Sequence, residues 1–160
     1  MKEEKIVLKE VVEAVNAIQD KKTERFIKEI IKAKKINVVG HGRSGYVASC
    51  FLMRLKHLGL KVSKQINKND LLIVISGSGE TKTILKKIKG VKSLIILLSI
   101  NQKSLIGKKS DIIIGVKAKK SKQPLRSLFE QSCLIYLDAI VMRLMKEIKV
   151  NEKEMWERHD

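Results

Sequence analysis

The middle of the chain contains short, mostly apolar runs that end at glycine, serine or charged residues. These runs are 36–39, 71–75, 94–98 and 112–116, and a weaker one lies at 61–66. A short apolar run without polar alternation is typical of a strand buried on both faces, as in a parallel sheet. The pattern therefore predicts several buried strands, and the run at 61–66 is a possible edge strand.

Between these runs, apolar residues recur three or four positions apart, which is the spacing of an amphipathic helix. Helices are expected around 8–18 and 26–31, after residue 45, after residue 81 and from about 127 to 148, with short ones at 104–108 and after Asn151. The expected inner face of the helix before Gly59 consists of Val47, Cys50, Phe51, Leu55 and Leu58. Strands that alternate with helices predict an α/β fold in which helices cover both faces of a parallel sheet.

The loop after the strand at 71–75 is the first candidate for chemistry. It reads Ser-Gly-Ser-Gly-Glu-Thr over 76–81 and leads into a predicted helix. A helix N-terminus offers unpaired N–H groups and partial positive charge, and glycine lets the backbone approach a ligand closely. We expect Ser76, Gly77, Ser78 and Thr81 to bind a phosphate monoester, because the loop lacks the lysine of a nucleotide-binding P-loop. The alternative is a polar turn without a ligand.

A second glycine loop follows the strand at 36–39. Gly40, Gly42 and Gly45 match the G-x-G-x-x-G pattern of dinucleotide sites, but residues 60–69 contain no Asp or Glu to bind the ribose. NAD is therefore not expected, and Arg43 and Ser44 indicate another turn that contacts an anion. Both glycine loops follow strands, and ligands of parallel sheets bind beyond the carboxyl ends of the strands.

Length and composition exclude several classes of protein. A chain of 160 residues with 44% hydrophobic residues is expected to form one globular domain. No apolar run approaches the roughly 20 residues of a membrane span, and the first residues lack the apolar stretch of a signal peptide. Cys50 and Cys133 lie in apolar helical patterns, so we expect buried thiols and a cytoplasmic, reducing location.

The formal net charge of +17 raises the question of nucleic-acid binding. Lysines are spread over most segments, however, and aromatic residues, which could stack on bases, are only 4% of the chain. The densest basic run, 117–122, lies in a predicted loop. We expect the charge to attract an anionic substrate and expect no nucleic-acid partner.

The motifs together resemble those of the sugar isomerase (SIS) domain family, and within it those of the 6-phospho-3-hexuloisomerases. The similar segments, which span nearly the whole chain, are 40–45, 53–59, 70–81, 129–130, 137–138 and 158–159. The resemblance implies a single SIS domain over 1–160, with a flavodoxin-like α/β/α sandwich around a five-stranded parallel sheet. It also implies a homotetramer without a cofactor, which interconverts 3-hexulose 6-phosphate and fructose 6-phosphate through a cis-enediol.

The chain departs from the family pattern at two places close to the expected site. The segment between Gly59 and Asp70 is several residues short, and Arg126 stands where the family usually has glycine. Two alternatives therefore stay open. One is a regulatory SIS module that binds a sugar phosphate without turnover, and the other is an isomerase of pentose or heptose phosphates.

The mechanism of such an isomerase assigns roles to particular residues. Ser76, Ser78 and Thr81 would anchor the phosphate, with Ser44 opposite them. Arg43 would contact the substrate or pair with an acid. No cluster of His, Cys and Asp has the spacing of a metal site.

Glu130 and His159 are the candidate acid–base groups. Glu130 would move a proton between neighbouring carbons, although a Glu in a first helical turn also simply favours the helix dipole. His159 would transfer protons at the sugar oxygens or open the ring, although a terminal His often has no role. The resemblance suggests that His159 reaches the site of a neighbouring subunit. Apolar residues around most of the helix at 127–148 also predict self-association, because one chain cannot bury all of its sides.

Overall fold

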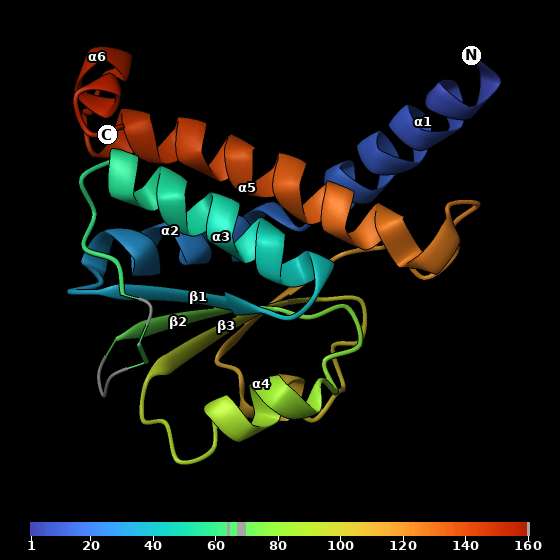
Figure 1. Cartoon of the computed structure of the whole chain (residues 1–160), viewed down its shortest axis with the longest axis horizontal. Helices are drawn as coiled ribbons and strands as arrows, with labels where there is room; N and C mark the ends of the chain where they lie inside the picture. The colour runs from blue at the N-terminus through green and yellow to red at the C-terminus, as the bar shows by residue number, and fades with distance from the viewer. Residues whose placement is uncertain (64, 67–69, 160) are drawn as a thin grey trace.

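The computed structural model describes residues 1–63, 65–66 and 70–159, and strands and helices alternate in it as predicted (Figure 1). In chain order the elements are α1 (Lys2–Asn16), α2 (Asp20–Lys32), β1 (Ile36–Gly40), α3 (Arg43–His57), β2 (Leu71–Ile75), α4 (Lys82–Lys87), β3 (Leu94–Ser99), η1 (Gly107–Lys109), β4 (Ile112–Gly115), η2 (Pro124–Arg126), α5 (Ser127–Glu147) and α6 (Glu152–Trp156). The two η elements are single 3-10 turns. The prediction of a helix at 104–108 is wrong, because only the turn η1 forms there.

The sheet has the order β1-β2-β3-β4, and every strand pair is parallel. Helices α2, α3 and α5 lie on one side of it and α4 lies on the other (Figure 1). This arrangement confirms the layered α/β prediction. It also places the loops after β1 and β2 at one edge of the sheet, because parallel strands end on the same side.

The expectation of five strands is wrong for the part of the chain that is described, where the sheet has four. The predicted edge strand at 61–66 is reduced to a single parallel bridge between Ile36 and Val62; residue 64 lies outside the described residues. Ile36 donates a backbone hydrogen bond to Lys61 and accepts one from Ser63, both at 2.9 Å. Few β-branched or aromatic side chains occur in this stretch, so little drives a longer pairing.

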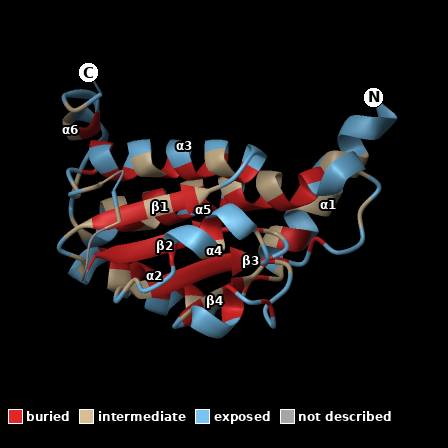
Figure 2. Cartoon of the chain, turned by 60° about the horizontal axis from the view of Figure 1, so that its bottom comes forward, coloured by how far each residue is buried: buried red, intermediate tan, exposed pale blue. Residues whose placement is uncertain are grey.

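The strand β2 explains why its sequence shows no polar alternation. All five of its residues are buried. Leu71, Ile73 and Ile75 face the larger core under α2, α3 and α5, whereas Leu72 and Val74 face a smaller core against α4. Figure 2 shows the strands as the buried centre of the molecule. Successive strand residues point to opposite faces, so a strand covered on both sides must be apolar at every position.

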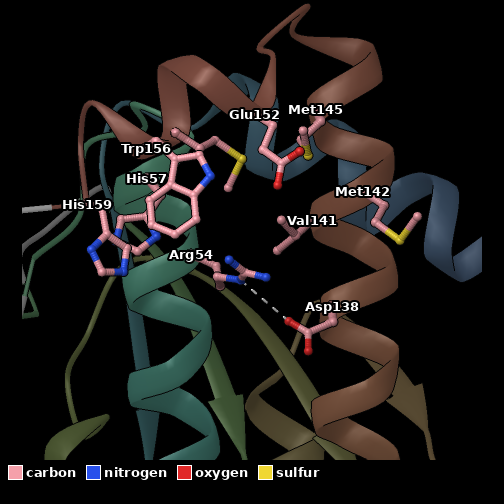
Figure 3. A pocket seen from close by; sticks show the side chains of 10 residues that line it. Arg54, His57, Asp138, Val141, Met142, Met145, Glu152, Trp156 and His159 are labelled. Atoms are coloured by element: carbon pink, nitrogen blue, oxygen red, sulfur yellow. Dashed lines mark ion pairs between the residues drawn. The ribbon is translucent and has the colours of Figure 1, made fainter.

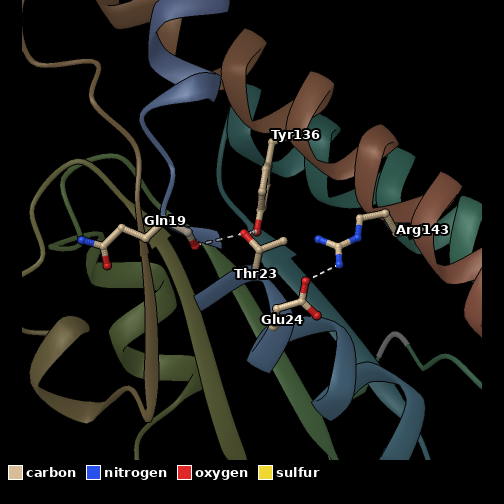
Figure 4. A network of polar contacts seen from close by, with 5 residues as sticks. All are labelled: Gln19, Thr23, Glu24, Tyr136 and Arg143. Atoms are coloured by element: carbon tan, nitrogen blue, oxygen red, sulfur yellow. Dashed lines mark hydrogen bonds and ion pairs between the residues drawn. The ribbon is translucent and has the colours of Figure 1, made fainter. Parts of the chain in front are cut away.

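Polar contacts tie α5 to α2 and so fix the course of the long helix (Figure 4). The Thr23 hydroxyl donates to the Gln19 carbonyl at 3.2 Å, and its oxygen lies 3.0 Å from the Tyr136 hydroxyl, which therefore donates to it. Burial raises the pKa of Tyr136 to about 12, so this hydroxyl stays protonated. Arg143 pairs with Glu24 further along α5.

Two apolar expectations fail at the surface. The helix α1 projects from the body (Figure 1), only Ala14 of it is buried, and Leu8 and Val12 are 65% and 56% exposed. Cys50, predicted on the inner face of α3, is exposed, whereas Cys133 is buried and burial raises the pKa of its thiol. Periodicity identified these helices as amphipathic, but α5 and the loop at 121–123 contact one side of α1 and leave Leu8 and Val12 exposed.

Candidate active site

The two glycine loops meet where the strand order of the sheet reverses. After β1 the chain returns through α3 to pair Val62 with one side of Ile36, and then crosses to place β2 on the other side. Crevices at such reversal points, beyond the carboxyl ends of the strands, are the usual ligand sites of open α/β sheets. The fold therefore brings the loops at 40–45 and 76–81 to the expected place.

The hydroxyls of the second loop have different environments. The Ser76 hydroxyl is buried, accepts the Gly79 N–H at 3.2 Å and lies 3.0 Å from the Thr81 hydroxyl. The Ser78 hydroxyl is exposed and accepts the Glu80 N–H at 3.2 Å. Ser76 and Thr81 thus brace the loop internally, and Ser78 is the hydroxyl that faces outward.

The glycines of this loop allow tight packing against two other segments. A Cβ atom on Gly77 would approach the Phe129 ring to 3.2 Å, so the loop touches the residue that precedes Glu130. Gly79 has a φ of +65°, and a Cβ there would collide with Ser104. A larger residue at 77 would displace the loop from the start of α5, and one at 79 would displace it from the segment after β3, which is the physical reason for glycine at these positions.

A hollow of about 400 Å³ opens beside this loop. It is lined by Gly77, Ser78, Glu80, Ile100, Asn101, Lys119 and Arg126. The two cations come from the long loop between β4 and α5. Sequence reasoning did not select Lys119 or Arg126 as binding residues, although the basic run at 117–122 and the arginine in a glycine position were the available signals.

The first glycine loop places Arg43 and Ser44 at the start of α3, against the start of α5. Gly42 adopts a φ of +58° before the helix. The Arg43 guanidinium donates to the Ser127 hydroxyl at 3.0 Å, and the Ser44 hydroxyl donates to the Glu130 carboxylate at 3.3 Å. The loop therefore contacts the candidate base Glu130 directly. Arg43 was expected to contact the substrate or pair with an acid, and here it donates to the Ser127 hydroxyl.

Glu130 combines one occupied oxygen with one that lacks a partner. Its Oε1 accepts the bond from Ser44, while its Oε2 is buried and has no hydrogen-bond partner among the described residues. An unpaired buried carboxylate oxygen is costly, so it favours any donor brought to it. A smaller hollow of about 210 Å³, lined by Arg43, Tyr46 and Glu130 among others, lies beside it. One buried oxygen of the Glu130 carboxylate is therefore left without a donor among the described residues.

His159 lies at the opposite end of the molecule (Figures 1 and 3). Its ring centre is 5.1 Å from that of His57, the last residue of α3, whereas Ser44 lies in the first turn of the same helix. A helix of 15 residues is about 22 Å long. Glu130 and His159 of one chain are therefore not brought together.

The surroundings of His159 form a second, larger groove of about 480 Å³. Met142, Met145 and Trp156 line it together with an ion pair at 3.8 Å between Arg54 and Asp138 (Figure 3). Burial lowers the pKa of His57, and nearby positive charge from His159, Arg54 and Lys56 lowers it further. The groove is mostly apolar, whereas polar and apolar groups line the hollow beside Ser78 in similar amounts.

The residues that the structure describes contain no cluster of three His, Cys, Asp or Glu side chains that could hold a metal ion. None of the helices in the described ranges has the length and apolar character needed to cross a membrane.

The chain is similar in sequence to known isomerases. A 3-hexulose-6-phosphate isomerase of Methanocaldococcus jannaschii is 40% identical over 149 residues, covering 86% of this chain and 82% of that protein. A 3-hexulose-6-phosphate isomerase of Bacillus subtilis is 31% identical over 172 residues, covering 96% and 93%. No protein-family model matches the chain.

The fold is likewise similar to solved structures. A Methanococcus jannaschii protein, whose crystal structure was used to infer a 3-hexulose-6-phosphate isomerase function, superposes with a TM-score of 0.87 at 35% identity, covering 100% of this chain and 98% of that one. A phosphoheptose isomerase of Francisella tularensis superposes with a TM-score of 0.71 at 16% identity, covering 88% and 92%, and supports the fold alone.

Proposed function

This chain belongs to the SIS-domain sugar-phosphate isomerase family, and from that premise we propose that it interconverts 3-hexulose 6-phosphate and fructose 6-phosphate. The observation that carries the proposal is the Glu130 carboxylate. It is held by Ser44 where both glycine loops meet the start of α5, and it keeps one oxygen free of partners among the described residues. A site of this kind combines an anchor for a phosphate with a base for the sugar carbons.

The reaction moves a carbonyl from C3 to C2. Glu130 takes the proton from C2 of the hexulose and returns it to C3 of the enediol, while a proton passes from O2 to O3. The Ser78 hydroxyl and the backbone of its loop hold the phosphate, which fixes C2 and C3 relative to the base. Ser44 keeps one carboxylate oxygen occupied, so the other is aimed at the substrate.

The transfer between O2 and O3 needs a second acid–base group, and we assign it to His159 of a neighbouring copy. Within one chain His159 lies about the length of α3 from Ser44. The exposed side chains of Ile135, Met142 and Trp156 on α5 and α6 support the expectation of a homotetramer, because apolar surface of this kind favours self-association. The complete site would then combine Glu130 of one subunit with His159 of another.

The coupled assay tests the proposal directly. The purified protein receives 3-hexulose 6-phosphate, and the fructose 6-phosphate formed is converted further with reduction of NADP, which is followed by absorbance. Turnover that Glu130→Gln removes supports the proposal. Pentose and heptose phosphates are assayed beside the hexulose phosphate. Faster turnover of any of them would contradict the proposal.

One observation favours a second candidate, a module that binds a sugar phosphate without turnover. The short segment after Gly59 leaves only the Ile36–Val62 bridge in place of an edge strand among the described residues. This bridge pairs the first residue of β1, so it does not reach Gly40, where the proposed site begins. Calorimetric binding of fructose 6-phosphate without any turnover of the sugar panel would select this candidate.

A further inference from the structure

The loop proposed to hold the phosphate lacks positive charge of its own. It contains no Lys or Arg between 76 and 81, and the helix that follows it, α4, has only six residues. Ser76 and Thr81 are engaged with each other, so Ser78 is left as the outward hydroxyl. A phosphate monoester, with a second pKa of about 6, carries nearly two negative charges at neutral pH. Most of the balancing charge must come from another segment.

Lys119 and Arg126 line the same hollow as Ser78. Neither side chain forms an ion pair or hydrogen bond with any residue that the structure describes. Glu80 also lines the hollow, but its Oε1 accepts the Leu105 N–H at 2.8 Å. The hollow is therefore lined by two cations without partners, Lys119 and Arg126, and by one carboxylate, Glu80, which already accepts a hydrogen bond.

The backbone around Arg126 is held in an unfavourable conformation. Leu125 and Arg126 have φ angles of +53° and +62°, although neither is glycine. Such residues persist where the surroundings hold them in place, and they gather at ligand sites. Here Ser127 supplies the restraint, because its hydroxyl donates to the Pro124 carbonyl at 2.8 Å and accepts from Arg43 at 3.0 Å.

The middle of the same loop is fastened to α1. The Glu10 carboxylate accepts hydrogen bonds from the Ser121 hydroxyl, the Lys122 N–H and the Gln123 side chain at 2.7, 2.9 and 3.0 Å. These bonds lower the pKa of Glu10, with the Lys122 N–H as the largest cause. The loop is thus restrained between Lys119 and Arg126 as well as at its end.

We propose that Lys119 and Arg126 supply the positive charge that binds the phosphate dianion of the substrate beside Ser78. The proposal rests on the phosphate site of the proposed function, but it does not depend on which sugar the enzyme turns over. In this proposal, two side chains from a loop distant in sequence supply the affinity for the dianion. The loop at 76–81 orients the phosphate through its hydroxyl and backbone groups. Glu10 is then a positioning residue for these cations.

The test compares two double variants with equal net charge. Lys119→Gln with Arg126→Gln removes the cations of the hollow, while Lys117→Gln with Lys120→Gln removes two exposed lysines of the same loop that do not line it. Binding of fructose 6-phosphate and of inorganic phosphate is measured by calorimetry at several salt concentrations. We expect the first variant to bind both probes at least about tenfold more weakly and with less salt dependence, because charge-assisted bonds are lost. The control should change by less than about twofold.

Equal losses in the two variants would overturn the proposal, since they would show only long-range attraction by the net charge. Unchanged binding in the first variant, or a wild-type protein that binds neither probe, would overturn it as well. Arg126→Lys should restore most of the affinity relative to Arg126→Gln if charge is the cause. Phosphate binding that depends on these cations without any turnover of the hexulose would refute the proposed function alone.

Discussion

The two ends of the molecule have hollows lined by different kinds of residue. At the carboxyl edge of the sheet, the hollow is lined by Gly77 and Ser78 of a glycine loop and by the cations Lys119 and Arg126, among others. At the opposite end, the groove is walled by methionines, by Trp156 at 64% exposure and by the paired rings of His57 and His159. The first surface suits a small anion, and the second suits apolar contact with another macromolecule.

The difference shows that the candidate chemistry is divided within one chain. Glu130 is at the first end with a free oxygen, and His159 is at the second end beside an open apolar groove. Either two copies combine these ends in one site, or His159 has no catalytic role. The predictions below separate these outcomes, beginning with the largest expected effect.

Glu130→Gln should lower turnover in the coupled assay by roughly 10²–10⁴-fold, the size of a lost general base. Gln preserves the shape and the contact with Ser44, so folding should not change. Glu147→Gln, at the exposed far end of α5, is the matched control and should retain activity. Activity of Glu130→Gln within threefold of wild type would remove the base from the mechanism.

His159→Ala should lower turnover by roughly 10²-fold while leaving the melting temperature unchanged, because the side chain is exposed and adds little to the core. Mixing His159→Ala chains with Glu130→Gln chains should restore part of the activity, since a mixed assembly contains intact shared sites. Light scattering should give a tetramer. No recovery despite subunit exchange, or a monomer at micromolar concentration, would show that His159 does not complete the site of a neighbouring copy.

Ser78→Ala should weaken fructose 6-phosphate binding by roughly 10- to 100-fold, which corresponds to the loss of one hydrogen bond to a charged group. Calorimetry measures the affinity directly. Ser49→Ala, an exposed serine on the surface of α3, provides the comparison and should bind normally. Full affinity in Ser78→Ala would favour the alternative that the loop at 76–81 is a polar turn without a ligand.

The smallest expected effect is on the pH dependence of folding stability, through His57 at the end of α3. Because burial lowers the pKa of His57, the unfolded chain binds the proton more tightly than the folded chain. Stability is therefore lost as pH falls below the usual histidine pKa of about 6.5 and toward the lowered value, and it is constant above that range.

His57→Gln should flatten this part of the stability profile, which is measured as melting temperature against pH. The exposed His41, changed to Gln, should leave the slope as in wild type. Parallel slopes in His57→Gln and wild type would show that another group causes the acid sensitivity.

The amino-acid sequence alone determined the elements with strong local patterns. The apolar run at 71–75 required a strand covered on both faces, and the glycine and hydroxyl residues after it required a tight turn. The position of both glycine loops also followed, since strands joined by helices run parallel and end at one edge. The start of α5 near Ser127, with Glu130 in its first turn, was predicted for the same local reasons.

Only the tertiary structure decided which distant segments meet. The edge strand at 61–66 shrank to one bridge, because strand pairing depends on partners and burial more than on intrinsic preference. Cys50 lies on an apolar helical pattern yet is exposed, since periodicity does not say how far a neighbouring element reaches. Lys119 and Arg126 join Ser78 from a segment some forty positions away, and His159 is carried to the far end by α5 and α6. Residues so far apart in sequence are brought to one hollow by tertiary packing, and no local pattern predicts which of them meet.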